Sequence, residues 1–173
     1  MERRMIAKRT RDLVRLLGEL KTLQERLLKL IEARIDAMKR ADMSAMRELV
    51  DREEELTRRI LERDGLRRQV ADAVAEETGC PPRSGRDMTV SQIAGRVGEP
   101  ARTHLLDAVA DLRRIVLRVV RANRTAGAVA RELINHVSWV FASVRPAGGK
   151  PVGYSGDGAV VGSAETRLFE TVG

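Results

Sequence analysis

The sequence predicts an all-α protein: an elongated bundle of three long antiparallel helices plus one short helix, followed by a flexible C-terminal tail. Leu, Arg, Ala and Glu dominate the composition, as is usual in long helices. Aromatic residues make up 2% of the chain and all lie after residue 138, whereas β-sheets use such residues throughout. Long segments also repeat apolar residues at steps of three and four, the period of an amphipathic helix.

The first two helices are expected over about Ile6–Arg40 and Met43–Thr78. One continuous helix from Ile6 to Thr78 is the alternative, but it would be about 110 Å long, far above the usual length. We therefore expect a tight turn near Ala41–Ser44, where Asp42 can serve as an N-cap. The two apolar stripes consist mainly of Leu13, Leu17, Leu20, Leu27, Ile31, Ile35 and Met38, then Met46, Leu49, Val50, Leu56, Ile60, Leu66, Val70 and Val74.

A loop and a short helix come next. Gly79 suits the position after a helix end and Pro81–Pro82 cannot continue a helix, so we expect a loop over Cys80–Met88. Thr89-Val-Ser-Gln92 matches a capping box, which predicts a short helix over Val90–Val97.

The last helix is expected from about Pro100 to Val144. Its apolar residues alternate four- and three-residue steps, which is the pattern of a heptad seam. Asn123 is the one polar residue in this pattern and is expected to fix its register. The predicted seam is Leu105, Val109, Leu112, Val116, Val119, Asn123, Ala126, Ala130, Leu133, Val137, Val140 and Val144.

Pro146 ends this helix, and the 28 residues from Pro146 to Gly173 contain seven of the chain's fourteen glycines. We therefore expect two regions: a helical bundle or coiled coil over 1–145 and a flexible tail over 146–173. No apolar run is long enough for a membrane helix, and no secretory signal begins the chain. Cys80, the only cysteine, is expected to be a reduced thiol in the cytoplasm.

No catalytic or cofactor-binding pattern is present. His104 and His136 lie far apart on one helix, and no cysteine or histidine cluster has metal-ligand spacing. The net charge of +7 raises the possibility of nucleic-acid binding. The basic residues are interleaved with acidic ones, however, and base-stacking aromatics are absent, so this remains a less favoured alternative.

The end of the last helix carries more apolar residues than one seam can use. We expect these side chains either to be covered by the bundle or to form an exposed groove for a partner helix, and we favour the groove. The candidate binding residues are Leu133, Ile134, Val137, Trp139, Val140, Phe141 and Val144.

The order of these features resembles that of the FlgN family. The resemblance is carried by the leucine-rich segment Leu13–Leu20, the small acidic junction Ala41–Ala45, the segment Thr89–Ile93, and Asn123 in the last helix before a glycine-rich tail with a single tyrosine. One departure is Ala126, where family members often have a second asparagine.

The resemblance implies a cytoplasmic chaperone domain without catalysis or cofactor. It implies that the protein holds the helical C-terminal segment of hook–filament junction proteins like FlgK and FlgL, prevents their premature assembly, and delivers them to FlhA at the flagellar type III export gate. Tyr154 is then the candidate for docking to the gate. We expect a monomer or weak homodimer, without membrane insertion. A structural coiled-coil protein that only self-associates is the alternative.

Overall fold

A computed structural model describes residues 2–77, 90–144, 153–154 and 160–161 of the chain. Its elements are four helices and two short strands: α1 Glu2–Lys39, α2 Met43–Glu77, α3 Val90–Ala94, α4 Ala101–Val144, β1 Gly153–Tyr154 and β2 Val160–Val161. The predicted all-helical architecture of three long helices and one short one is confirmed. The two strands were not predicted; they pair antiparallel, with Tyr154 opposite Val160. The expected loop over 80–88 and the rest of the tail lie outside the described residues.

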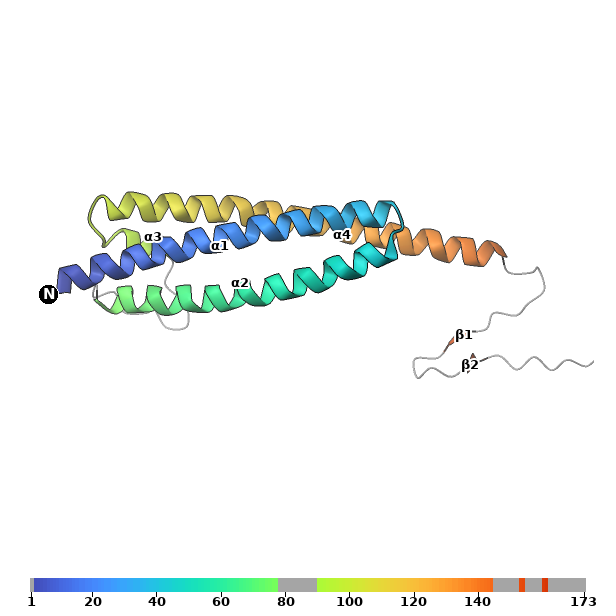
Figure 1. Ribbon diagram of the computed structural model, residues 1–173, viewed down its shortest axis with the longest axis horizontal. Coiled ribbons are helices and arrows are strands. Elements are labelled where there is room, and N and C mark those ends of the chain that lie inside the picture. Colours follow the sequence, from blue (N-terminus) through green and yellow to red (C-terminus); the bar gives the residue numbers. More distant parts are fainter. Residues whose placement is uncertain (1, 78–89, 145–152, 155–159, 162–173) are drawn as a thin grey trace, which may run out of the picture. The chain divides into compact units, whose positions relative to one another are not determined.

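The chain divides into two compact units, Met1–Leu133 and Ile134–Gly173, so the division falls inside α4. The two regions expected from the sequence, 1–145 and 146–173, stay a prediction. In the first unit, Figure 1 shows α1 (blue) beside α2 (cyan to green), with the two helices running in opposite directions. Two ion pairs fix this antiparallel register, Arg9 with Glu77 at 3.0 Å and Arg34 with Glu53 at 2.7 Å.

The turn between α1 and α2 confirms that the two helices are separate. Ala41 has a positive φ of 54°, the left-handed conformation found just past many helix ends. The Ala41 and Asp42 N–H groups donate to the carbonyls of Met38 and Ala37, each at 3.0 Å, which completes a Schellman motif. Asp42 then caps α2, because its Oδ1 accepts from the Ala45 N–H at 3.0 Å.

The short helix α3 ends at Ala94, three residues before the predicted end. The Arg96 N–H bonds back three residues to the Ile93 carbonyl at 2.9 Å, so the chain tightens into a turn. Helix α4 begins at Ala101. The Glu99 carboxylate lies over its first turn and accepts from the Thr103 N–H at 3.3 Å and the Thr103 hydroxyl at 2.8 Å. Glu99 thus caps α4, because Pro100, the residue directly before the helix, has no side-chain acceptor for the first N–H groups.

The core consists of two clusters along the first unit. At one end, α3 lies against the other three helices, with Ile93 fully buried among residues of α1, α2 and α4. Its buried members are Leu13, Leu17, Ala71, Val74, Ala75, Val90, Ile93, Ala94 and Leu105. The second cluster joins α1 to α2 and α4 without α3. Its buried members are Leu23, Leu27, Leu28, Ile31, Ile35, Leu56, Ile115, Val119 and Ala126.

The three long helices contribute unequally to this core. Helix α1 buries eleven apolar side chains, and all seven of those expected to form its stripe are among them. Helix α2 buries four, namely Leu56 and then Ala71, Val74 and Ala75. Between these two points, Leu61 and Leu66 are exposed. The middle of α2 is therefore held by far less apolar burial than α1.

The seam of α4 follows the predicted pattern at every seventh residue. Leu105, Val119 and Ala126 are buried, and Leu112 and Leu133 are half-buried. Between these residues, the structure buries Ile115 and half-buries Ala108, Ala122 and Val129, which were not predicted. The extra positions are used because α4 packs in a groove between helices, so both flanks of the seam make contacts.

The prediction that Asn123 lies inside the heptad seam was wrong. Its side chain is exposed at the edge of the seam, where its Oδ1 accepts from Nη2 of Arg34 at 3.4 Å. An amide at this position can reach both water and the guanidinium, so it escapes the cost of burying an unpaired polar group. Asn123 therefore links α4 to α1 from the outside of the interface.

Candidate protein-binding surface

The last three turns of α4 expose their apolar side chains. Ile134 is 63% exposed and Phe141 is 72% exposed, and Val137 and Val140 are exposed as well. Leu133, the first residue of this group, is half-buried. The side chains of Val144 and Tyr154 lie outside the described residues. The structure thus leaves uncovered Ile134 and Phe141, which the sequence marked as surplus to the seam. It also exposes Val137 and Val140, so the prediction that the seam continues through these two residues was wrong.

These residues form one continuous face of the helix. Ile134, Val137 and Phe141 follow steps of three and four, and Val140 fits the same side. With a turn every 3.6 residues, the face from Val140 to Ile134 spans about 120° of the helix circumference. We call this surface the apolar stripe; its members are Leu133, Ile134, Val137, Val140 and Phe141.

Trp139 points away from the apolar stripe, although the sequence analysis grouped it with these residues. Its position on the helix is about 160° from the centre of the stripe. The indole is 67% exposed and stacks on the His136 ring, with 6.4 Å between ring centroids and 27° between ring planes. A single partner helix on the stripe therefore cannot also contact Trp139.

The exposed segment carries no formal charge. From Leu133 to Val144 no Asp, Glu, Lys or Arg is present, although such residues make up 33% of the whole chain. Helical surfaces in water normally carry charged residues on their exposed side. An exposed apolar stripe without flanking charge is the usual mark of a protein-binding surface.

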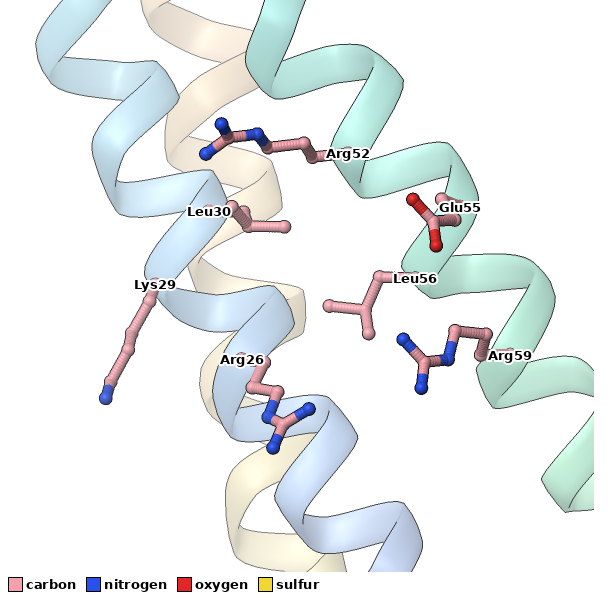
Figure 2. A pocket seen from close by; sticks show the side chains of 7 residues that line it. All are labelled: Arg26, Lys29, Leu30, Arg52, Glu55, Leu56 and Arg59. Atoms are coloured by element: carbon pink, nitrogen blue, oxygen red, sulfur yellow. The ribbon is translucent and has the colours of Figure 1, made fainter.

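A concave surface lies between α1 and α2. Figure 2 shows Leu30 and Leu56 between the two helices, with the guanidinium groups of Arg26 and Arg59 beside them and Lys29 turned outward. The groove has a volume of about 350 Å³ and is also lined by Arg52 and Glu55. Its rim is charged and its apolar floor is narrow, so it offers a partner helix much less apolar area than the stripe does.

Polar contacts between helices hold the scaffold that carries α4. Nε of Arg34 donates to Glu53 Oε1 at 2.7 Å, and these two side chains are only 18% and 15% exposed. Because Arg34 also bonds to Asn123, one side chain of α1 joins both other long helices. Nζ of Lys21 donates to Asp111 Oδ2 at 2.6 Å, again between α1 and α4.

The Lys21–Asp111 pair changes the acidity of both partners. The hydrogen bond and the charge of Lys21 lower the pKa of Asp111, and the same two effects from Asp111 raise the pKa of Lys21. On α2, partial burial raises the pKa of Asp64, but hydrogen bonds and charges from Arg67 and Arg68 outweigh it, so the pKa is lowered overall. All three shifts favour the charged forms that the ion pairs need.

Within the described part of the chain, no cluster of His, Cys, Asp and Glu is arranged to hold a metal ion. None of the helices that the structure describes combines the length and the apolarity needed to cross a bilayer. His104 is exposed on α4, and His136 makes the ring contact with Trp139. The apolar stripe is therefore the surface with the clearest potential for binding.

Comparison with known proteins identifies a matching family. A family model described as FlgN protein matches residues 5–162, a range that contains α2, α3, α4 and both strands and nearly all of α1. No curated protein and no solved structure matches the chain.

Proposed function

The chain belongs to the FlgN family of cytoplasmic, non-enzymatic flagellar export chaperones for the hook-associated proteins FlgK and FlgL, and on this premise we propose that it holds its client on the apolar stripe of α4. The observation that carries the proposal is the exposure of Ile134, Val137, Val140 and Phe141 on one uncharged face. A chaperone needs such a face before its client arrives, because apolar burial is the main driving force of association.

The shape of the stripe fits a helical client segment. The stripe is about 120° wide, and the helical segment that carries it, Leu133 to Val144, extends over about 18 Å, or about three turns. One apolar row of an amphipathic helix can lie along it, with the two helices packed side by side. We therefore propose the helical C-terminal segment of a FlgK- or FlgL-like protein as the occupant.

Occupation of the stripe would explain how premature assembly is prevented. A client helix whose apolar row lies on α4 cannot use that row to pair with another client subunit. Phe141 and Ile134 are the most exposed members of the stripe, so they have the most apolar area to bury. Their loss should weaken binding more than that of the half-buried Leu133.

Delivery to the export gate is the second part of the proposal. The family resemblance points to FlhA as the receiving component and to Tyr154 as the contact residue. In support, the backbone of Tyr154 belongs to β1, which pairs with β2. A tyrosine on a short paired strand is held in place more firmly than one in an unpaired segment, which lowers the entropic cost of docking.

We also propose that the free chaperone is a monomer or weak homodimer. The apolar area of the stripe is small compared with the area that a stable dimer buries. The mass measured by light scattering over a range of concentrations tests this point. A dimer that persists after dilution would instead favour a self-associating coiled-coil protein.

The client site is tested with a synthetic peptide that corresponds to the C-terminal segment of a FlgK or FlgL protein. We expect the full-length chain to bind it at 1:1 in a calorimetric titration, and Ile134→Ala/Phe141→Ala to bind it at least about tenfold more weakly. Trp139→Ala is the matched control, because it removes an equally exposed aromatic from the opposite side of the same helix. Unchanged affinity in the double variant, with an unchanged circular dichroism spectrum, would refute the proposed site.

A further inference from the structure

The outward side of α4 carries a second unusual surface, well before the apolar stripe. From Arg113 to Arg131 the helix contains six arginines and no Asp or Glu. This segment alone supplies +6 of the chain's net charge of +7. All six arginines are exposed: Arg113, Arg114, Arg118, Arg121, Arg124 and Arg131.

The charge of this segment is almost unpaired. Arg114 lies 3.3 Å from Asp111, in a contact where the arginine side chain is 74% exposed. Among the residues that the structure describes, the other five arginines form no ion pair. Neutralisation by the protein itself is therefore slight, and the surface presents a strong positive potential to an incoming partner.

Apolar side chains are exposed within the same surface. Leu117 is 49% exposed, and Val120 is also exposed. On a helix, residues three and four positions away are direct neighbours, so Leu117 is surrounded by Arg113, Arg114, Val120 and Arg121. Leu117 lies about 160° around the helix from the buried residues Ile115 and Val119, so this side faces away from the core.

We propose that this surface, the arginine face of α4, is a docking site for an acidic amphipathic helix of another protein. The exposed Leu117 and Val120 would contact an apolar row on the partner, and the arginines around them would bind carboxylates. Arginine suits this role because its guanidinium can donate two parallel hydrogen bonds to one carboxylate.

The pattern favours a protein helix over other anionic ligands. Arg114 and Arg121 are seven residues apart, and so are Leu117 and Arg124, which is the repeat that a second helix would share. A surface for single-stranded nucleic acid would use aromatic side chains to stack bases, and none lies between residues 113 and 131. A membrane-binding helix separates its apolar face from its basic face, whereas here Arg113 and Arg124 lie on the apolar side itself.

The arginine face shares no residue with the apolar stripe, so the two sites can be tested separately. The probe is a synthetic helical peptide with Leu and Glu in a seven-residue repeat, and the control peptide has Lys in place of Glu. We expect the full-length chain to bind the acidic peptide at physiological salt, as measured by fluorescence anisotropy, and to bind the basic one at least about tenfold more weakly. Arg113→Gln/Arg121→Gln should weaken binding of the acidic peptide about tenfold and leave binding of the client peptide unchanged.

Leu117→Ala distinguishes a protein helix from a simple polyanion. This substitution keeps the net charge, and because Leu117 is exposed the fold should be kept as well. The variant should nevertheless bind the acidic peptide about threefold or more weakly. The proposal is overturned if the acidic peptide does not bind, or if Leu117→Ala leaves its affinity unchanged. Tighter binding of duplex DNA, single-stranded RNA or anionic phospholipid vesicles than of the acidic peptide would also overturn it. Phe141→Ala should leave binding of the acidic peptide unchanged. This control would show that the peptide does not bind at the apolar stripe.

Discussion

Replacement of Ala41 by glycine should stabilise the protein. Ala41 has a φ of 54°, and the left-handed conformation costs a residue with a β-carbon about 1–2 kcal/mol relative to glycine. The hydrogen bonds from the Ala41 and Asp42 N–H groups involve only the backbone, so Ala41→Gly keeps both. Glycine also gains freedom in the unfolded chain, which offsets about 0.5–1 kcal/mol of the benefit. We expect a net increase of about 0.5–1 kcal/mol in the free energy of unfolding.

Urea denaturation followed by circular dichroism at the helix band measures this change. For a chain of this length the same gain corresponds to a melting temperature higher by about 1–4 °C. The matched control is Ala33→Gly, at an exposed position inside α1, which should lose about 1 kcal/mol because glycine disfavours helix interiors. If Ala41→Gly were destabilised as much as Ala33→Gly, residue 41 would have to be helical and the two helices continuous, and the reasoning would fail.

Three further results are expected. Arg34→Ala should lower the free energy of unfolding by about 2–3 kcal/mol in urea denaturation, because it leaves the mostly buried Glu53 without its partner. The control, Lys39→Ala, removes the exposed pair with Asp36 and should cost less than about 0.5 kcal/mol. The lowered pKa of Asp111 means that its contribution to stability is complete above the ordinary carboxyl pKa of about 4 and is lost as the pH falls further. Wild type and Asp111→Asn should therefore converge in stability in acid, and a gap that widened there would contradict this sign. Trp139, the only tryptophan, should be readily quenched by acrylamide, and the client peptide should leave that quenching unchanged because it binds on the opposite side of α4. Protection of the indole by the client would show that the client wraps around the helix.

The helices and the surplus apolar end could be predicted from the sequence because both depend on local periodicity. The three- and four-residue steps of α1 place Leu13 and Ile31 on one face, and both are fully buried. The same periodicity identified Ile134 and Phe141 as additional to the seam. The side of α4 on which Trp139 lies could also have been predicted, by counting around the helix in steps of 100° per residue.

Other features depend on contacts between distant parts of the chain. The seam of α4 uses Ile115 as well as its predicted members because α4 lies between two helices, and a single helix pattern does not show how many neighbours it has. The exposure of Asn123 depends on Arg34, which comes 89 residues earlier. The turn was predicted without its mechanism, since the left-handed position is occupied by Ala41 instead of the glycine that usually marks it.

The uneven distribution of buried side chains has a consequence for motion. Helix α2 is anchored at Leu56 and again from Ala71 to Ala75, and the intervening turns bury no side chain fully. Segments with little apolar burial open locally at a lower free energy than the rest of a domain. The middle of α2 should therefore lift from the bundle while α1 and α4 stay paired. Opening of this kind exposes backbone amides to solvent exchange far more often than global unfolding does.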